Sequence, residues 1–153
     1  MTAKFQRQVE AALKEFVADA ALSGGLLRER DLELQFQLAP HQPPSKLPAT
    51  KMAVFGFWAG DMWLKLSYAG PKSHARYASQ HYRAGSAPST LAADLADDTQ
   101  MLLASGFSPS AAGEWLKLSA HRFNVFVPAD RPVSVLRDLK AFLNDRLKPR
   151  YGR

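Results

Sequence analysis

Apolar residues recur every three or four positions in the first twenty residues of the chain. Those on this spacing are Phe5, Val9, Leu13, Phe16 and Ala20. The spacing predicts an amphipathic helix that ends at the glycines of the sequence SGG, residues 23–25. Charged residues interrupt the same stretch, so it is typical of neither a signal peptide nor a membrane span.

The next segments carry the patterns of strands. Four apolar residues alternate with polar ones and predict a half-buried strand: Leu32, Leu34, Phe36 and Leu38. Residues 39–50 are too rich in proline to be anything but a loop. Two aromatic-rich runs, 51–58 and 62–68, are separated by the sequence AGD and predict a β-hairpin.

Helical patterns follow the hairpin. Residues 72–82 predict a short helix, Ser89 can cap a helix over 90–105, and a further helix fits 108–121 with Pro109 in its first turn. A third strand is predicted over 122–128, and a last helix begins near Pro132 and ends before Pro149. This order predicts an α+β fold with a small, mainly antiparallel three-stranded sheet flanked by helices, and an extra helix and strand at the N-terminus.

The length, net charge and cysteine content of the chain exclude some classes of function and favour others. The chain has 153 residues, enough for one cored domain, which we divide into an accessory segment (1–46) and a compact part (47–153). Its net charge of +6 favours polyanionic partners such as nucleic acid. The chain has no cysteine, which excludes disulfides, zinc-thiolate sites and thiol nucleophiles. We expect a cytoplasmic protein with no membrane partner.

A basic segment follows the hairpin. The fully charged residues between Met62 and Ala93 are all cations: Lys65, Lys72, Arg76 and Arg83. On one helix, Arg76, Gln80 and Arg83 would share a face that can grip a phosphate. The alternative, which the pattern alone favours, is a solvated basic face with Tyr77 and Tyr82 in the core. For His81, a general base and a structural or phosphate-contacting residue are the alternatives, because no nearby acid or cysteine completes a metal site.

The run KLSYAGPKSHARYASQHYRAGSAPSTLAADLADD (65–98), with GEWLKLSAHRFNVFVP (113–128) and LKAFLNDRLKPRYG (139–152), resembles a bacterial branch of the GIY-YIG nuclease superfamily. The resemblance covers residues 47–152. It implies a small α/β nuclease fold and metal-dependent hydrolysis of a DNA phosphodiester. In that family, two strand tyrosines and a helix arginine surround the phosphate, and a glutamate on a later helix holds a Mg²⁺-like ion.

This chain departs from the family at several of these positions. Phe55 stands where the first tyrosine is expected, and Ser67 and Tyr68 replace the glycine and the following base of the second motif. Lys140 takes the place of the glutamate, close to the core-facing stripe of its helix, so we expect no metal ligand there. The positions that match the family site are Phe55, Lys65, Tyr68, Arg76 and His81.

Three functions are compatible with this pattern. The first is a catalytically degenerate domain, without a cofactor, that binds nucleic acid, most simply DNA, or a nucleic-acid-associated protein. Its binding residues would be Lys65, Lys72, Arg76, Gln80, Arg83, Lys148 and Arg150. The second is an active Mg²⁺-dependent endonuclease in which Tyr68 or Tyr77 supplies the hydroxyl and Glu114 a ligand. The third is a protein-binding inhibitor or adaptor, which would expose Trp58 and Trp63, although both fit the hairpin core better.

Overall fold

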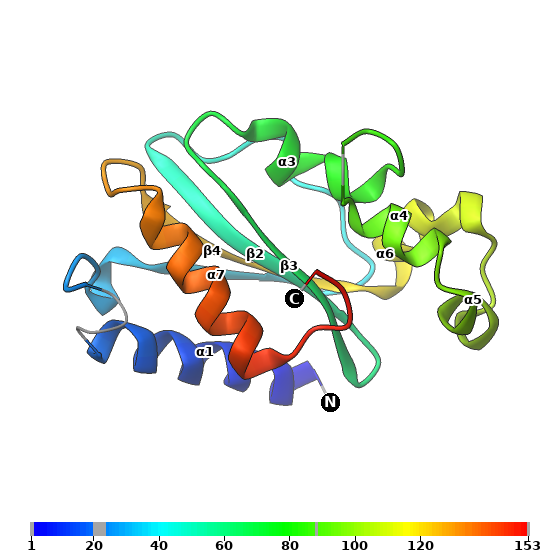
Figure 1. Ribbon diagram of the computed structural model, residues 1–153, viewed down its shortest axis with the longest axis horizontal. Coiled ribbons are helices and arrows are strands. Elements are labelled where there is room, and N and C mark those ends of the chain that lie inside the picture. The colour runs from blue at the N-terminus through cyan, green and yellow to red at the C-terminus, as the bar shows by residue number, and fades with distance from the viewer. Residues whose placement is uncertain (1, 20–23, 88, 153) are drawn as a thin grey trace.

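The computed structural model describes residues 2–19, 24–87 and 89–152, and its centre is an antiparallel sheet (Figure 1). The sheet contains four strands in the order β1-β4-β2-β3. Their bounds are Glu33–Gln37 for β1, Lys51–Ala59 for β2, Met62–Ala69 for β3 and His121–Pro128 for β4. The predicted α+β class and hairpin are confirmed.

The prediction of three strands was wrong, because β1 joins the sheet. It pairs with β4 from Glu33 opposite Phe126 to Gln37 opposite Arg122. This pairing satisfies the backbone of β4 on the side away from β2 and brings Leu34 and Phe36 onto the core. The described residues of the accessory segment therefore contribute to the same sheet and core as the rest of the chain.

Strand β3 is the other edge of the sheet, and the C-terminal tail covers its beginning. The Arg150 and Tyr151 amides donate to the carbonyls of Trp63 and Leu64, at 3.0 and 2.9 Å. Strand β2 is paired on both sides and is buried from Met52 to Ala59.

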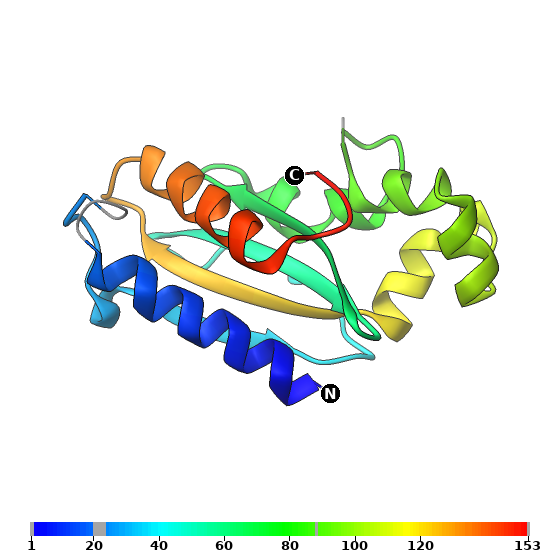
Figure 2. The ribbon, with the colours of Figure 1, turned by 60° about the horizontal axis from the view of Figure 1, so that its bottom comes forward.

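Two helices cover one face of the sheet. Helix α1 (Thr2–Ala18) and helix α7 (Ser134–Leu147) lie side by side across it (Figures 1 and 2). The periodic residues of α1 are buried there as predicted, except Ala20, which lies outside the described residues. Trp58 and Trp63 belong to the same core, so both are hairpin core residues. Within the described part of the chain, no helix has the length and apolar character to cross a membrane.

Shorter helices lie on the opposite face and at one end of the sheet (Figure 2). They are α3 (His74–Ala78), α4 (Leu91–Ala96), α5 (Thr99–Ser105) and α6 (Ala112–Ser119), with 3₁₀ turns at Glu29–Asp31, Gln80–Tyr82 and Pro109–Ala111.

The structure corrects two of the predicted helices. Residues 72–82 break after α3, and the following 3₁₀ turn buries His81 and Tyr82 together. Residues 90–105 form α4 and α5, capped by Thr90 and Asp98, whose side-chain oxygens accept backbone hydrogen bonds at 3.3 and 3.2 Å. Ser89, the predicted cap, instead has a φ of 58°.

Candidate functional site

A small cavity opens at the edge of β3, between α3 and α7. Its volume is about 230 Å³, and it is lined by Ser67, Tyr68, Gly70, Ser73, Arg76 and Lys140. We call it the cationic cavity, because two of these residues are cations and none is an acid. Strand β3, the Gly70–Ser73 turn, α3 and α7 each contribute to it. It is formed by the segments on which the sequence motifs lie.

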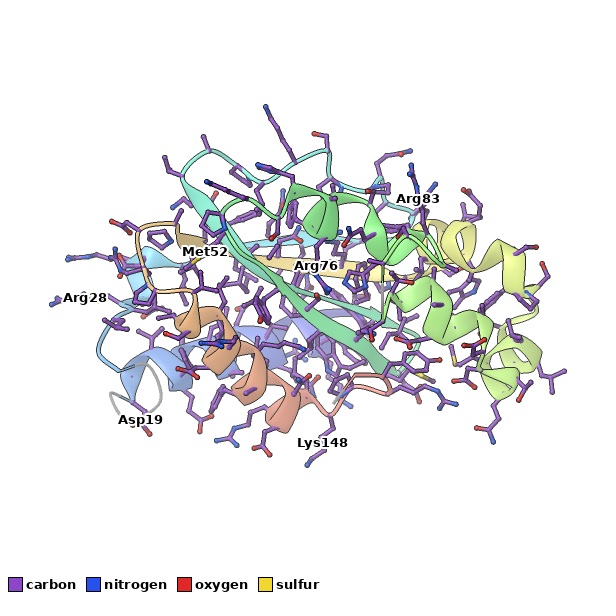
Figure 3. All side chains as sticks on the ribbon, turned by 45° about the horizontal axis from the view of Figure 1, so that its top comes forward. Asp19, Arg28, Met52, Arg76, Arg83 and Lys148 are labelled. Carbon is purple, nitrogen blue, oxygen red and sulfur yellow. The ribbon has the colours of Figure 1, made fainter. Side chains whose placement is uncertain are left out.

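Arg76 is held toward the sheet. Its Nη1 donates to the Ser67 hydroxyl at 3.3 Å, and Figure 3 shows the side chain between α3 and β3 near the middle of the molecule. The guanidinium is partly exposed and forms no ion pair within the described residues. Most of its hydrogen-bonding capacity is therefore available to a ligand.

Lys140 reaches the same cavity from α7. Its neighbours Leu136, Leu139 and Leu143 are buried, and Lys140 itself is half-buried, as expected for a position beside the core-facing stripe. The ammonium lies 5.9 Å from the centre of the Tyr68 ring. Burial lowers the pKa of Lys140, and the positive charges of Lys65 and Arg76 lower it further.

The residues of the cationic cavity do not fit a Mg²⁺ ion. Such an ion requires oxygen ligands, usually with a carboxylate among them, whereas two cations face this space. Across residues 2–19, 24–87 and 89–152, no group of three histidine, aspartate or glutamate side chains is arranged to hold a metal. Glu114, the proposed substitute ligand, is exposed on α6 and pairs with Lys117 at 2.9 Å.

Lys65 is close to the cavity but already has partners. Its ammonium is buried and donates to the Asp94 carboxylate at 2.5 Å and to the Ser89 carbonyl at 2.7 Å. The sequence has only cations between Met62 and Ala93, but the fold brings an acid, Asp94, to Lys65. The carboxylate comes from α4, one residue beyond the segment between Met62 and Ala93 in which all the fully charged residues are cations.

His81 is buried and neutral. Its Nδ1 accepts the Leu91 amide at 3.1 Å, which assigns the ring proton to Nε2, and this atom has no partner among the described residues. Burial lowers the pKa of His81 to about 3, with further lowering by the surrounding cations, Lys65 first among them. The ring can donate a hydrogen bond from Nε2, but this tautomer has no free lone pair with which to act as a general base.

Phe55, which stands where the family has its first tyrosine, lies beside a buried polar cluster that the sequence pattern did not predict. Phe55 is fully buried, and the guanidinium of Arg122 stacks over its ring at 4.4 Å. Arg122 is also fully buried and donates to Asn124 Oδ1, to the Tyr82 hydroxyl and to the Tyr77 carbonyl, at 2.8, 3.2 and 2.6 Å. The Tyr77 ring is also buried, 4.8 Å from the same guanidinium, so Phe55 and Tyr77 are packing residues around a buried arginine.

The remaining predicted binding residues do not converge on the cavity. Arg83 and Lys148 are exposed at opposite margins of the molecule (Figure 3). Arg150 forms a two-point ion pair with Asp98, at 2.6 and 3.2 Å. Of the others, Gln80 is half-buried in the 3₁₀ turn after α3, and Lys72 is exposed beside the cavity.

Comparison with known proteins found no family model that matches the chain, and no curated protein or solved structure similar to it. The resemblance to GIY-YIG nucleases therefore depends on the sequence pattern alone.

Proposed function

We propose that this protein is a GIY-YIG-like domain of the cytoplasm that binds nucleic acid, most simply DNA, without cutting it. The observation that carries the proposal is the cationic cavity, where Arg76 and Lys140 face one space that no carboxylate lines. The resemblance assigns these two positions to the phosphate and the metal of a nuclease. A cation in place of the metal ligand converts the site into one for an anion.

The chemistry of the cavity suits a phosphodiester. Arg76 can donate two parallel hydrogen bonds to phosphate, because the planar guanidinium matches the spacing of two phosphate oxygens. Lys140 adds a point charge, and the Ser67 and Ser73 hydroxyls supply neutral donors. A bound phosphate would also offset the repulsion between the two cations, which adds to the effects of burial and of Lys65 in lowering the pKa of Lys140.

The other two functions have less support. An active endonuclease would need a carboxylate at the cavity, and Glu114 lies elsewhere on α6. A protein-binding adaptor was expected to expose Trp58 and Trp63, and both are buried. We therefore take neither as the function.

Salt dependence of DNA binding tests the proposal. We expect the affinity for a fluorescent oligonucleotide, measured by anisotropy in EDTA, to fall as salt rises. Arg76→Gln and Lys140→Gln should each weaken binding and reduce the salt slope by about one unit on duplex DNA. Lys14→Gln on α1 removes the same charge from an exposed site away from the cavity and should leave the slope unchanged. Equal effects of all three variants would contradict the proposal.

A further inference from the structure

A second hollow adjoins the cationic cavity. Its volume is about 440 Å³, and it is lined by Tyr68, Gly70, Pro71, Lys72, Ser73 and Val133. It shares Tyr68, Gly70 and Ser73 with the cationic cavity. The two spaces are therefore halves of one groove, which we call the β3-edge groove. One half is cationic and the other is largely apolar.

The apolar half is a surface on which a flat aromatic ring can stack. Tyr68 is only partly buried, and Val133, just before α7, is 44 % exposed. Gly70 adds no side chain to this surface, and a Cβ at that position would just contact the Val133 side chain at 4.0 Å, so the glycine leaves room beside Val133. Exposed apolar and aromatic groups beside a phosphate-binding site are a stacking surface for bases. Lys72 adds a cation at the rim.

We propose that the β3-edge groove holds one unpaired nucleotide, with its phosphate in the cationic cavity and its base stacked over Tyr68 and Val133. This inference rests on the nucleic-acid binding proposed above and specifies the form of the polymer. Charge complementarity selects the phosphate for the Arg76 end. The shared Tyr68 keeps the two halves within reach of a single nucleotide.

The groove therefore favours single-stranded over duplex DNA. A base inside a duplex is paired and stacked on its neighbours, so it must leave the stack before it can reach Tyr68. An unpaired base enters without that cost. Every base has a π-face, so the groove should tolerate different base sequences.

Binding of three matched oligonucleotides tests this inference. They are a short single strand, the same strand in a duplex, and a strand with the same backbone but no bases. At one salt concentration, we expect the intact single strand to bind the full-length protein most tightly. The base-free strand should bind at least about fivefold more weakly, the lower end of the range for a lost stacking contact.

Two variants separate stacking from charge. Tyr68→Leu retains an apolar side chain, so it should weaken the intact strand about fivefold or more and weaken the base-free strand much less. Arg76→Gln should weaken both strands. The comparison of strands on the unchanged protein does not depend on how well either variant folds.

The possible failures are distinguishable. Equal affinities for the intact and base-free strands, or a preference for the duplex, would overturn the inference, whereas salt-sensitive binding that depends on Arg76 would still support the proposed function. If no DNA binds even at low salt, both ideas are wrong.

Discussion

We predict that His81 makes the protein less stable as the pH falls. Its ring is 2 % exposed, and its pKa in the folded protein is about 3, against 6.5 in an unfolded chain. Because the folded value is the lower one, the unfolded state takes up a proton first on acidification. The contribution of His81 is therefore complete above about pH 6.5 and is lost progressively between there and about pH 3.

The size of the effect follows from the two pKa values. Each unit of difference corresponds to about 1.4 kcal/mol, so complete protonation of the unfolded state costs the folded protein up to about 5 kcal/mol. Between pH 7 and pH 4, the loss should be about 3 kcal/mol. That figure depends mainly on the unfolded value, because the folded protein is still largely unprotonated at pH 4.

Urea unfolding at pH 7 and pH 4, followed by the fluorescence of the buried tryptophans, measures this loss. His81→Gln keeps a side-chain acceptor for the Leu91 amide without the titration. The wild-type protein should therefore lose about 3 kcal/mol more than this variant between the two pH values. His74→Gln is the matched control, because it replaces an exposed histidine whose Nδ1 likewise accepts a backbone amide, that of Leu47 at 3.1 Å. If wild type and His81→Gln lose stability in parallel, the assignment of His81 as a buried neutral ring is wrong.

Three further predictions concern packing and charge. Arg122→Lys should lower the free energy of unfolding by about 2 kcal/mol or more, because a single ammonium cannot reach the Tyr77 carbonyl and the other two acceptors; an unchanged urea midpoint would contradict this. Gly113→Ala should lower the melting temperature, although alanine normally favours a helix, because the new Cβ would lie 2.2 Å from the Tyr82 carbonyl oxygen; a higher melting temperature would show that α6 can move away. Phosphate or sulfate should raise the melting temperature more than Mg²⁺ at equal ionic strength, with a smaller gain in Lys140→Ala; an equal gain in the variant would remove Lys140 from the anion site.

Local patterns predicted much of the fold because they reflect burial directly. Phe5, Val9 and Phe16 repeat with the period of a helix, and all three are buried on α1. The alternation in β1 likewise predicted a half-buried strand. It did not predict that β1 pairs with β4, because alternation is a property of one strand and pairing is a long-range choice. The break after α3 was missed for a related reason. The chain leaves the helix so that His81 and Tyr82 are both buried, and this tertiary packing is not contained in the helical spacing of residues 72–82.

The candidate site was predictable only in part. The resemblance led to Arg76 and Lys140, and the structure has both lining one cavity. It gave no indication of Asp94, which pairs with Lys65 from a separate helix. Arg122 was overlooked because its strand reads as an apolar run. A signal was nevertheless present, since Arg122 and Asn124 are two residues apart and so share one face of the strand.

The most direct test of the central claim, that this protein binds DNA without cutting it, measures binding and cleavage in one experiment. Supercoiled plasmid, linear duplex and single-stranded DNA are incubated with the protein in Mg²⁺ or Mn²⁺, beside Arg76→Ala and Lys140→Glu. Each sample is divided between a native gel for binding and a denaturing gel for cleavage. We predict that the wild-type protein retards the DNA and leaves it intact, and that Arg76→Ala retards it less. Metal-dependent cleavage by the wild-type protein that disappears in Arg76→Ala would contradict the account.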